Sequence, residues 1–149
     1  MIKKIAIWFL CLSVLFGQFS MAEEKFLSLK KSKVNVRYGP SFDSKIKYIY
    51  KKINLPIKQI DQKENFRRIV DLKNNSGWIH ISQIKKSNSI IILEDKILYK
   101  KPSNFSKPIA KLEKGRLLIL KKCENNWCNV KTEDYSGWVK TENIWGSIK

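Results

Sequence analysis

From residue 26 onwards, short runs of β-branched and aromatic residues alternate with clusters of glycine, proline and polar residues. The clusters YGPS, KKIN, DQKEN and KNNSG are typical of turns. No run keeps the 3.6-residue period of an amphipathic helix over several turns. The pattern therefore predicts strands at 33–37, 46–50, 55–60, 66–72 and 77–81, and then at 96–100, 108–112, 116–120, 127–131 and 137–141.

The same series of predicted strands and turns occurs twice along the chain. Pro40 of YGPSFDSK aligns with Pro102 of YKKPSNFSK, and Phe66 of ENFRRIV aligns with Trp127 of NNWCNVK. The strings SGWI and SGWV align as well. The offset shortens by one residue between successive matches, in places where turns are expected, and turns tolerate such changes better than strands. We therefore expect two homologous units, 26–86 and 87–149.

The length of each unit suits a small barrel. Short strands separated by tight turns, in units of about 60 residues, are typical of closed or nearly closed β-barrels. Closure removes the exposed strand edges that so small a sheet would otherwise present. The expected fold class is all-β, with two tandem barrels.

The order of the motifs resembles a known family. In the first unit NVRYGPS, YKKINLPIKQI, NFRRIVD and SGWIH follow one another, as they do in the bacterial SH3 domain family of exported proteins. The second unit is similar but lacks Asn-Val-Arg, keeps GWV, and adds a terminal NIWG. The resemblance covers essentially the whole chain after residue 22, and it implies two tandem SH3-like barrels.

The first 22 residues have the features of a secretory signal peptide. Lys3 and Lys4 precede the apolar run IAIWFLCLSVLFG, and Ser20 and Ala22 are the small residues expected before a cleavage point. The apolar run is shorter than the roughly 20 residues that span a bilayer. Cleavage after Ala22 is expected, with export of the remainder, most simply to the periplasm.

The chain is strongly basic, with 30 Lys and Arg against 13 Asp and Glu and a net charge of +17. A charge of this size attracts anionic partners such as wall polymer, membrane headgroups or nucleic acid. However, lysine far outnumbers arginine and is spread along the whole chain, as an AT-rich genome would produce. We expect no specific nucleic-acid recognition, because that usually uses arginine as well as lysine.

The sequence offers little material for catalysis or for metal and cofactor binding. After the signal peptide there is one histidine, His80, whose expected role is a hydrogen bond at the surface or at the end of a barrel. A nucleophilic site needs a nucleophile beside an oriented base, and a tetrahedral zinc site needs four ligands. We expect no catalytic residues, no metal and no cofactor.

Two cysteines remain after the signal peptide, Cys123 and Cys128. Four residues separate them, with apolar runs on both sides, which places them at facing positions of a hairpin. An exported protein meets an oxidising compartment, so a disulfide is expected.

Aromatic residues outside the two SGW strings are the candidate ligand-binding groups. Val130 and Ile69 are expected to face the cores, which places Trp127 and Phe66, three positions earlier, on the opposite face. Such outward rings resemble those that hold extended or proline-rich peptides in SH3 domains. Tyr38 and Phe42 are expected to provide the facing wall. Alternatively, these rings pack between the two units or cover a barrel end.

The remaining motif residues are expected to be structural. Arg37 is expected to hydrogen-bond loop carbonyls or a carboxylate, and Gly39-Pro40 to form a turn. Gly77 and Gly137 mark a tight turn or a close backbone approach. Trp78 and Trp138 are expected to supply apolar core area.

Two functional hypotheses follow. The first is a non-catalytic cell-envelope binding module that recognises peptide or peptidoglycan. The second is a structural or accessory envelope subunit that binds a protein partner or an anionic membrane surface.

Overall fold

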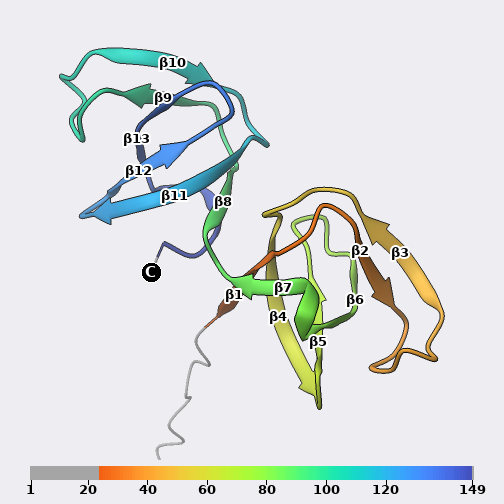
Figure 1. The fold of residues 1–149 in the computed structure, drawn as a ribbon. Helices are drawn as coiled ribbons and strands as arrows, with labels where there is room; N and C mark the ends of the chain where they lie inside the picture. Colours follow the sequence, from red (N-terminus) through yellow and green to blue (C-terminus); the bar gives the residue numbers. More distant parts are fainter. Residues whose placement is uncertain (1–23, 149) are drawn as a thin grey trace, which may run out of the picture.

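The computed structural model describes residues 24–148, and they form two strand-rich units (Figure 1). The predicted signal peptide, 1–22, lies outside the described residues. The first unit contains β1 (Lys25–Leu29), β2 (Val34–Arg37), β3 (Ile46–Tyr50), β4 (Pro56–Lys63), β5 (Phe66–Val70), β6 (Ser76–His80), the 3-10 turn η1 (Ile81–Gln83) and β7 (Ile84–Lys86). The second contains β8 (Ser89–Ile92), β9 (Lys96–Tyr99), β10 (Pro108–Leu112), β11 (Leu117–Glu124), β12 (Trp127–Lys131), β13 (Ser136–Lys140) and β14 (Ile144–Gly146).

The two sheets have the same topology. The first has the strand order β3-β2-β6-β5-β4-β1-β7 and the second β10-β9-β13-β12-β11-β8-β14, with every described pair antiparallel. Adding seven to each label of the first order gives the second, so the repeat seen in the sequence is a repeat of structure. The predicted all-β fold of two tandem small domains is confirmed. The boundaries 26–86 and 87–149 stay a prediction.

Each sheet curls around its own hydrophobic core. The first core contains residues from β1, β2, β4, β5 and β6, all fully buried: Leu29, Val34, Val36, Ile57, Ile69 and Ile79. The second core includes Leu98, Leu118, Val130 and Val139, at positions equivalent to Val36, Ile57, Ile69 and Ile79, and adds Cys128. Burial of aliphatic groups stabilises each unit by about 25 cal/mol for each Å² removed from water. No helix within 24–148 has the length and apolar character needed to cross a membrane.

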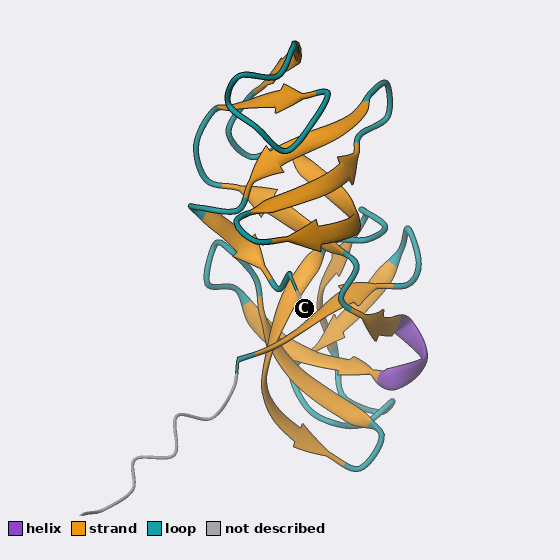
Figure 2. Cartoon of the chain, turned by 90° about the vertical axis from the view of Figure 1, so that its left-hand side faces the viewer, coloured by secondary structure: helices purple, strands orange, loops and turns teal. Residues whose placement is uncertain are grey.

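The two units are joined by polar and aromatic contacts as well as by the chain. The buried hydroxyls of Ser28 and Ser89 share a hydrogen bond of 2.8 Å, and Ser89 Oγ also donates to the carbonyl of Asn54. Trp145 Nε1 donates to the Pro56 carbonyl at 3.0 Å. The C-terminal end of the chain accordingly lies at the junction of the two units (Figure 2).

Candidate functional site

The outer faces of the two central hairpins carry most of the aromatic candidates. In β5 and β6, Ile69 and Ile79 face the core, so the alternate residues face outwards. The register pairs Phe66 with His80 and Arg68 with Trp78. We call these four residues the first outer strip. It places two aromatic rings, an imidazole and a guanidinium on one face of the sheet.

Phe42 covers one end of the first outer strip. Its ring centroid lies 5.2 Å from that of Phe66 and 4.9 Å from that of His80, and the Phe66 and His80 rings are 5.1 Å apart. Phe66 is consequently only 6% exposed, whereas Phe42 is 63% exposed. Phe66 faces outwards as expected but lies beneath Phe42, and its contact with a ligand stays a prediction. The accessible ring at this end of the strip is Phe42.

His80 has a local structural role within this cluster. Its Nδ1 lies 2.8 Å from Ser82 Oγ and accepts a hydrogen bond from the Ser82 backbone N–H at 3.2 Å. This bond caps the 3-10 turn that leads from β6 to β7. The imidazole is therefore fixed in orientation, with one face against aromatic rings.

Arg37 fixes the loop that carries Phe42. Its guanidinium donates to the carbonyls of Phe42 at 3.0 Å and Ser44 at 2.9 Å, and lies 5.6 Å from the centroid of the Phe42 ring. A Cβ at Gly39 in the same loop would lie 2.7 Å from Ser44 Oγ. The charged Arg37 thus holds a loop together, and its contacts position the exposed ring.

A shallow hollow of about 280 Å³ continues the first outer strip beyond Arg68 and Trp78. Tyr38, Lys47, Ser76 and Gly77 also line it. Lys47 Nζ lies 5.6 Å from the Tyr38 ring centroid and donates to the Ser76 carbonyl at 2.8 Å. Tyr38 itself is 67% exposed. Tyr38 and Phe42 therefore flank the strip at different ends and do not form one wall.

The turn before β6 is built around Asp71. Its Oδ1 accepts hydrogen bonds from the backbone N–H groups of Lys73 and Asn75, both at 2.9 Å, while Oδ2 accepts one from the Tyr50 hydroxyl at 3.0 Å. Burial, together with the neighbouring Tyr48 hydroxyl, raises the pKa of Tyr50 well above its usual value. The neutral phenol therefore remains a donor at any physiological pH, which anchors the start of the SGW strand.

The second unit repeats the arrangement with different residues. Trp127 faces Lys140 across β12 and β13, and Asn129 faces Trp138. We call these four residues the second outer strip. Tyr99 packs on Trp127 with ring centroids 5.6 Å apart, and Lys140 Nζ lies 5.8 Å from the Trp127 centroid. A hollow of about 660 Å³, lined in part by Asn129, Ser136 and Gly137, lies beyond.

The two SGW strings open strands β6 and β13, and their tryptophans face outwards. Gly77 and Gly137 are buried, and a Cβ at Gly77 would lie 2.4 Å from Val36 Cγ1 and 3.0 Å from the Arg37 carbonyl. Trp78 and Trp138 alternate with these glycines and are only half-buried. The expectation that both tryptophans supply the cores is therefore wrong. The following residues, Ile79 and Val139, occupy the core positions instead.

The predicted disulfide joins Cys123 and Cys128 in the structure. The two cysteines face each other across the β11–β12 hairpin, as their spacing predicted. Cys128 is fully buried in the second core, so the bond ties the hairpin end to that core. Within residues 24–148, no group of three or more histidine, cysteine or acidic side chains is arranged to hold a metal ion.

Comparison with known proteins agrees with this architecture of paired barrels with outward-facing strips. The family model for the Bacterial SH3 domain matches residues 30–86 and again 95–146. The chain therefore belongs to the Bacterial SH3 domain family, with two copies of the domain in tandem. No curated protein matches the chain.

Two solved structures are distantly similar to this chain. They are NlpC2 and NlpC1 from Trichomonas vaginalis, each 10% identical in sequence, with TM-scores of 0.39 and 0.38. The matches cover 83% and 86% of this chain and 48% of each of the other chains. The chain therefore spans about half the length of these proteins, and the likeness is too distant to inform function.

Proposed function

We propose that this protein is a non-catalytic binding module of the cell envelope, and that its two outer strips bind an extended peptide or a peptidoglycan strand. Membership of a family of binding domains supports a binding role over a catalytic one. The disulfide is consistent with an exported protein, because disulfides persist in oxidising compartments. The ligand itself is inferred from the outer strips.

The observation that carries the proposal is the recurrence of aromatic and polar groups at equivalent outward positions of both units. The first strip pairs Trp78 with Arg68, and the second pairs Trp138 with Asn129 beside Trp127 and Lys140. Flat apolar rings bind sugar faces or extended peptide, while adjacent donors fix the orientation of the ligand. Two such strips on one chain raise the overall affinity, because the second contact becomes intramolecular.

The test is co-sedimentation of the folded protein with purified peptidoglycan sacculi at low and high salt. Binding that survives high salt is expected, because aromatic contacts are not screened by ions. Trp127→Ala should weaken binding severalfold without unfolding the second unit. Tyr135→Ala removes another exposed aromatic ring, outside both strips, and serves as the matched control.

Other outcomes identify the alternative. If binding by the parent protein and by both variants disappears at high salt, the effect is only general attraction by lysines, and the strips are refuted as the binding surface. Absence of sacculus binding, together with capture of a single envelope protein, would favour an accessory subunit. Binding only to anionic vesicles would favour a membrane surface as the partner.

A further inference from the structure

The loop that connects β9 to β10, residues 100–107, carries a fully exposed aromatic ring. Phe105 is 100% exposed, and within residues 24–148 it packs against no other aromatic side chain. The loop lies at the end of β10 that points away from the first unit, because the opposite end, the turn at 113–116, shares a hollow with residues 52–54 (Figure 1). Single exposed apolar residues are common on protein surfaces, so the surroundings of this ring decide what it does.

Hydrogen bonds within the loop hold the ring in place. The Lys100 backbone N–H donates to the Lys107 carbonyl at 2.9 Å, which closes the base of the loop. Near the tip, the Ser103 carbonyl accepts from the Ser106 N–H at 3.1 Å, and the Ser103 hydroxyl accepts from the Phe105 N–H at 3.2 Å. The backbone that presents the ring is therefore already ordered, and binding through it does not have to pay for ordering a loop.

The equivalent loop of the first unit, residues 38–45, shows that the turn does not require a phenylalanine at the tip. Its Asp43 N–H donates to the Ser41 hydroxyl at 3.1 Å, which is the same bond that Phe105 makes in the second unit. An exposed carboxylate thus forms the same turn as the exposed ring. The phenylalanine of the first loop, Phe42, packs back onto the first outer strip instead. Folding therefore does not account for Phe105.

Positive charge surrounds the exposed ring. Lys100, Lys101 and Lys107 are exposed, and none of the salt bridges within residues 24–148 includes them. The whole segment 96–112 contains no aspartate or glutamate. At the base of the loop, Lys100 and Lys107 line the hollow of about 660 Å³ together with Lys121, and no acidic residue lines it. The loop is therefore a cationic surface with an apolar tip.

A second, smaller hollow beside the loop is closer to neutral. Three carboxylates share it with Asn104, and they belong to Glu94, Asp95 and Glu142. Glu94 and Asp95 each pair with a lysine at 3.0 Å, and two lysine side chains line the same hollow. These carboxylates therefore do not cancel the charge of Lys100, Lys101 and Lys107.

We propose that the 100–107 loop docks on a lipid bilayer that contains anionic lipids, with the Phe105 ring inserted among the headgroups and the three lysines beside their phosphates. A specific protein interface buries about 1,000 Å² or more, whereas this surface is a narrow tip with one ring. A bilayer surface accepts such a ring, and anionic headgroups attract each nearby lysine. The loop lies outside both outer strips, so this docking goes beyond the proposed sacculus binding.

The test is co-sedimentation of the folded chain from residue 23 onwards with vesicles. This chain contains both cores but lacks the apolar run 5–17, which could insert into lipid by itself. It should bind vesicles of equimolar phosphatidylglycerol and phosphatidylcholine, and not vesicles of phosphatidylcholine alone. Phe105→Ala should weaken binding about tenfold, and Phe105→Leu should restore it to within about threefold of the parent. The melting temperature should stay unchanged in both variants, because the ring has no packing partner.

Two matched controls separate the loop from general charge and from any exposed ring. Replacing its three lysines by glutamine should weaken vesicle binding tenfold or more, since each contributes about fivefold. The same replacement of three exposed lysines in the β1–β2 turn should cost less than about threefold; these are Lys30, Lys31 and Lys33. Tyr135→Ala, the ring control, should bind within about twofold of the parent.

Several results would overturn the proposal. They are equal losses in the two lysine variants, full binding by Phe105→Ala, equal binding to both kinds of vesicle, or no vesicle binding at all. Sacculus binding is measured in parallel, because it separates this proposal from the previous one. Phe105→Ala should leave sacculus binding unchanged, and Trp127→Ala should leave vesicle binding unchanged, so either proposal can fail without the other.

Discussion

Replacing Gly77 by alanine tests how closely strands β2 and β6 pack at the SGW string. The added Cβ would lie 2.4 Å from Val36 Cγ1 and 3.0 Å from the Arg37 carbonyl oxygen. Val36 is fully buried, and its β-branched side chain has few other rotamers available. Relief therefore requires the β2 backbone to move away from β6. Such overpacking costs about 1–3 kcal/mol.

A smaller gain opposes this cost. Replacing glycine by alanine restricts the unfolded chain, which stabilises a protein by about 0.4–1 kcal/mol where the folded backbone allows it. The net expectation for Gly77→Ala is a loss of about 1–2 kcal/mol in the free energy of unfolding. With a urea m-value of about 1 kcal/mol/M for a small domain, the midpoint should fall by about 1 M or more.

The assay is urea unfolding followed by circular dichroism, with amide hydrogen exchange to locate the effect. Lost protection should centre on β2 and β6. Gly39→Ala is the control, because its Cβ would meet only the Ser44 hydroxyl, which rotates away. An unchanged midpoint for Gly77→Ala, or an equal fall for Gly39→Ala, would refute the reasoning.

Three further predictions concern other parts of the molecule. Reducing the Cys123–Cys128 disulfide should lower the free energy of unfolding by about 2 kcal/mol, the entropy of closing so short a loop; an identical urea midpoint with and without reductant would contradict it. Trp145→Phe keeps a ring at the junction but removes the indole N–H that donates to the Pro56 carbonyl of the first unit. The free energy of unfolding should fall by about 1 kcal/mol, measured by thermal unfolding. An unaltered melting temperature would count against this. The hydrogen bond from Lys96 lowers the pKa of the exposed Glu94 carboxyl below its usual value, so its stabilising effect is present at neutral pH and lost as the pH falls through that lowered pKa. Glu94→Gln should therefore flatten the decline in melting temperature below about pH 5, and a decline as steep as in the parent protein would argue otherwise.

The sequence predicted the strands that carry a clear apolar pattern and missed those that depend on their neighbours. β7 and β14 have three residues each and gain their extended conformation by pairing with β1 and β8. β8 has the sequence SIII and is buried at all four positions. One of its faces meets the second core and the other meets the junction, so the alternation that marks a surface strand is absent.

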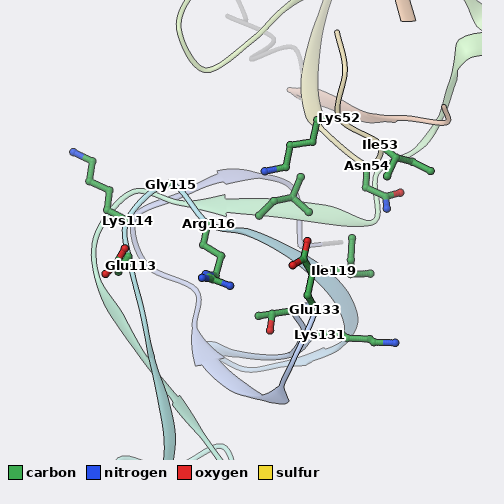
Figure 3. Close-up of a pocket in the computed structure, with 12 residues that line it drawn as sticks. Lys52, Ile53, Asn54, Glu113, Lys114, Gly115, Arg116, Ile119, Lys131 and Glu133 are labelled. Carbon is green, nitrogen blue, oxygen red and sulfur yellow. The ribbon is translucent and has the colours of Figure 1, made fainter. Parts of the chain in front are cut away.

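The candidate site was predicted only in part for a similar reason. The outward position of Trp127 follows from alternation along β12, because that rule depends on one strand alone. The burial of Phe66 depends on where the loop carrying Phe42 folds, which no local pattern encodes. The groove of about 620 Å³ between the units draws on three separate segments, 52–54, 113–117 and 131–133 (Figure 3), and the first of them is hydrogen-bonded to Ser89 of the second unit. Sequence offers no signal for such an assembly.

The indole of Trp145 has a consequence for the order in which the molecule matures. All seven strands of the first unit have been synthesised by Lys86, so that unit can form its sheet while the second is still emerging. The hydrogen bond to Pro56 and the edge-to-face contact with Phe26 must wait for β14. The full set of contacts between the two units therefore forms only once the last strand is in place. A nascent or truncated chain would thus carry a folded first barrel without the Trp145 contacts that tie it to the second unit.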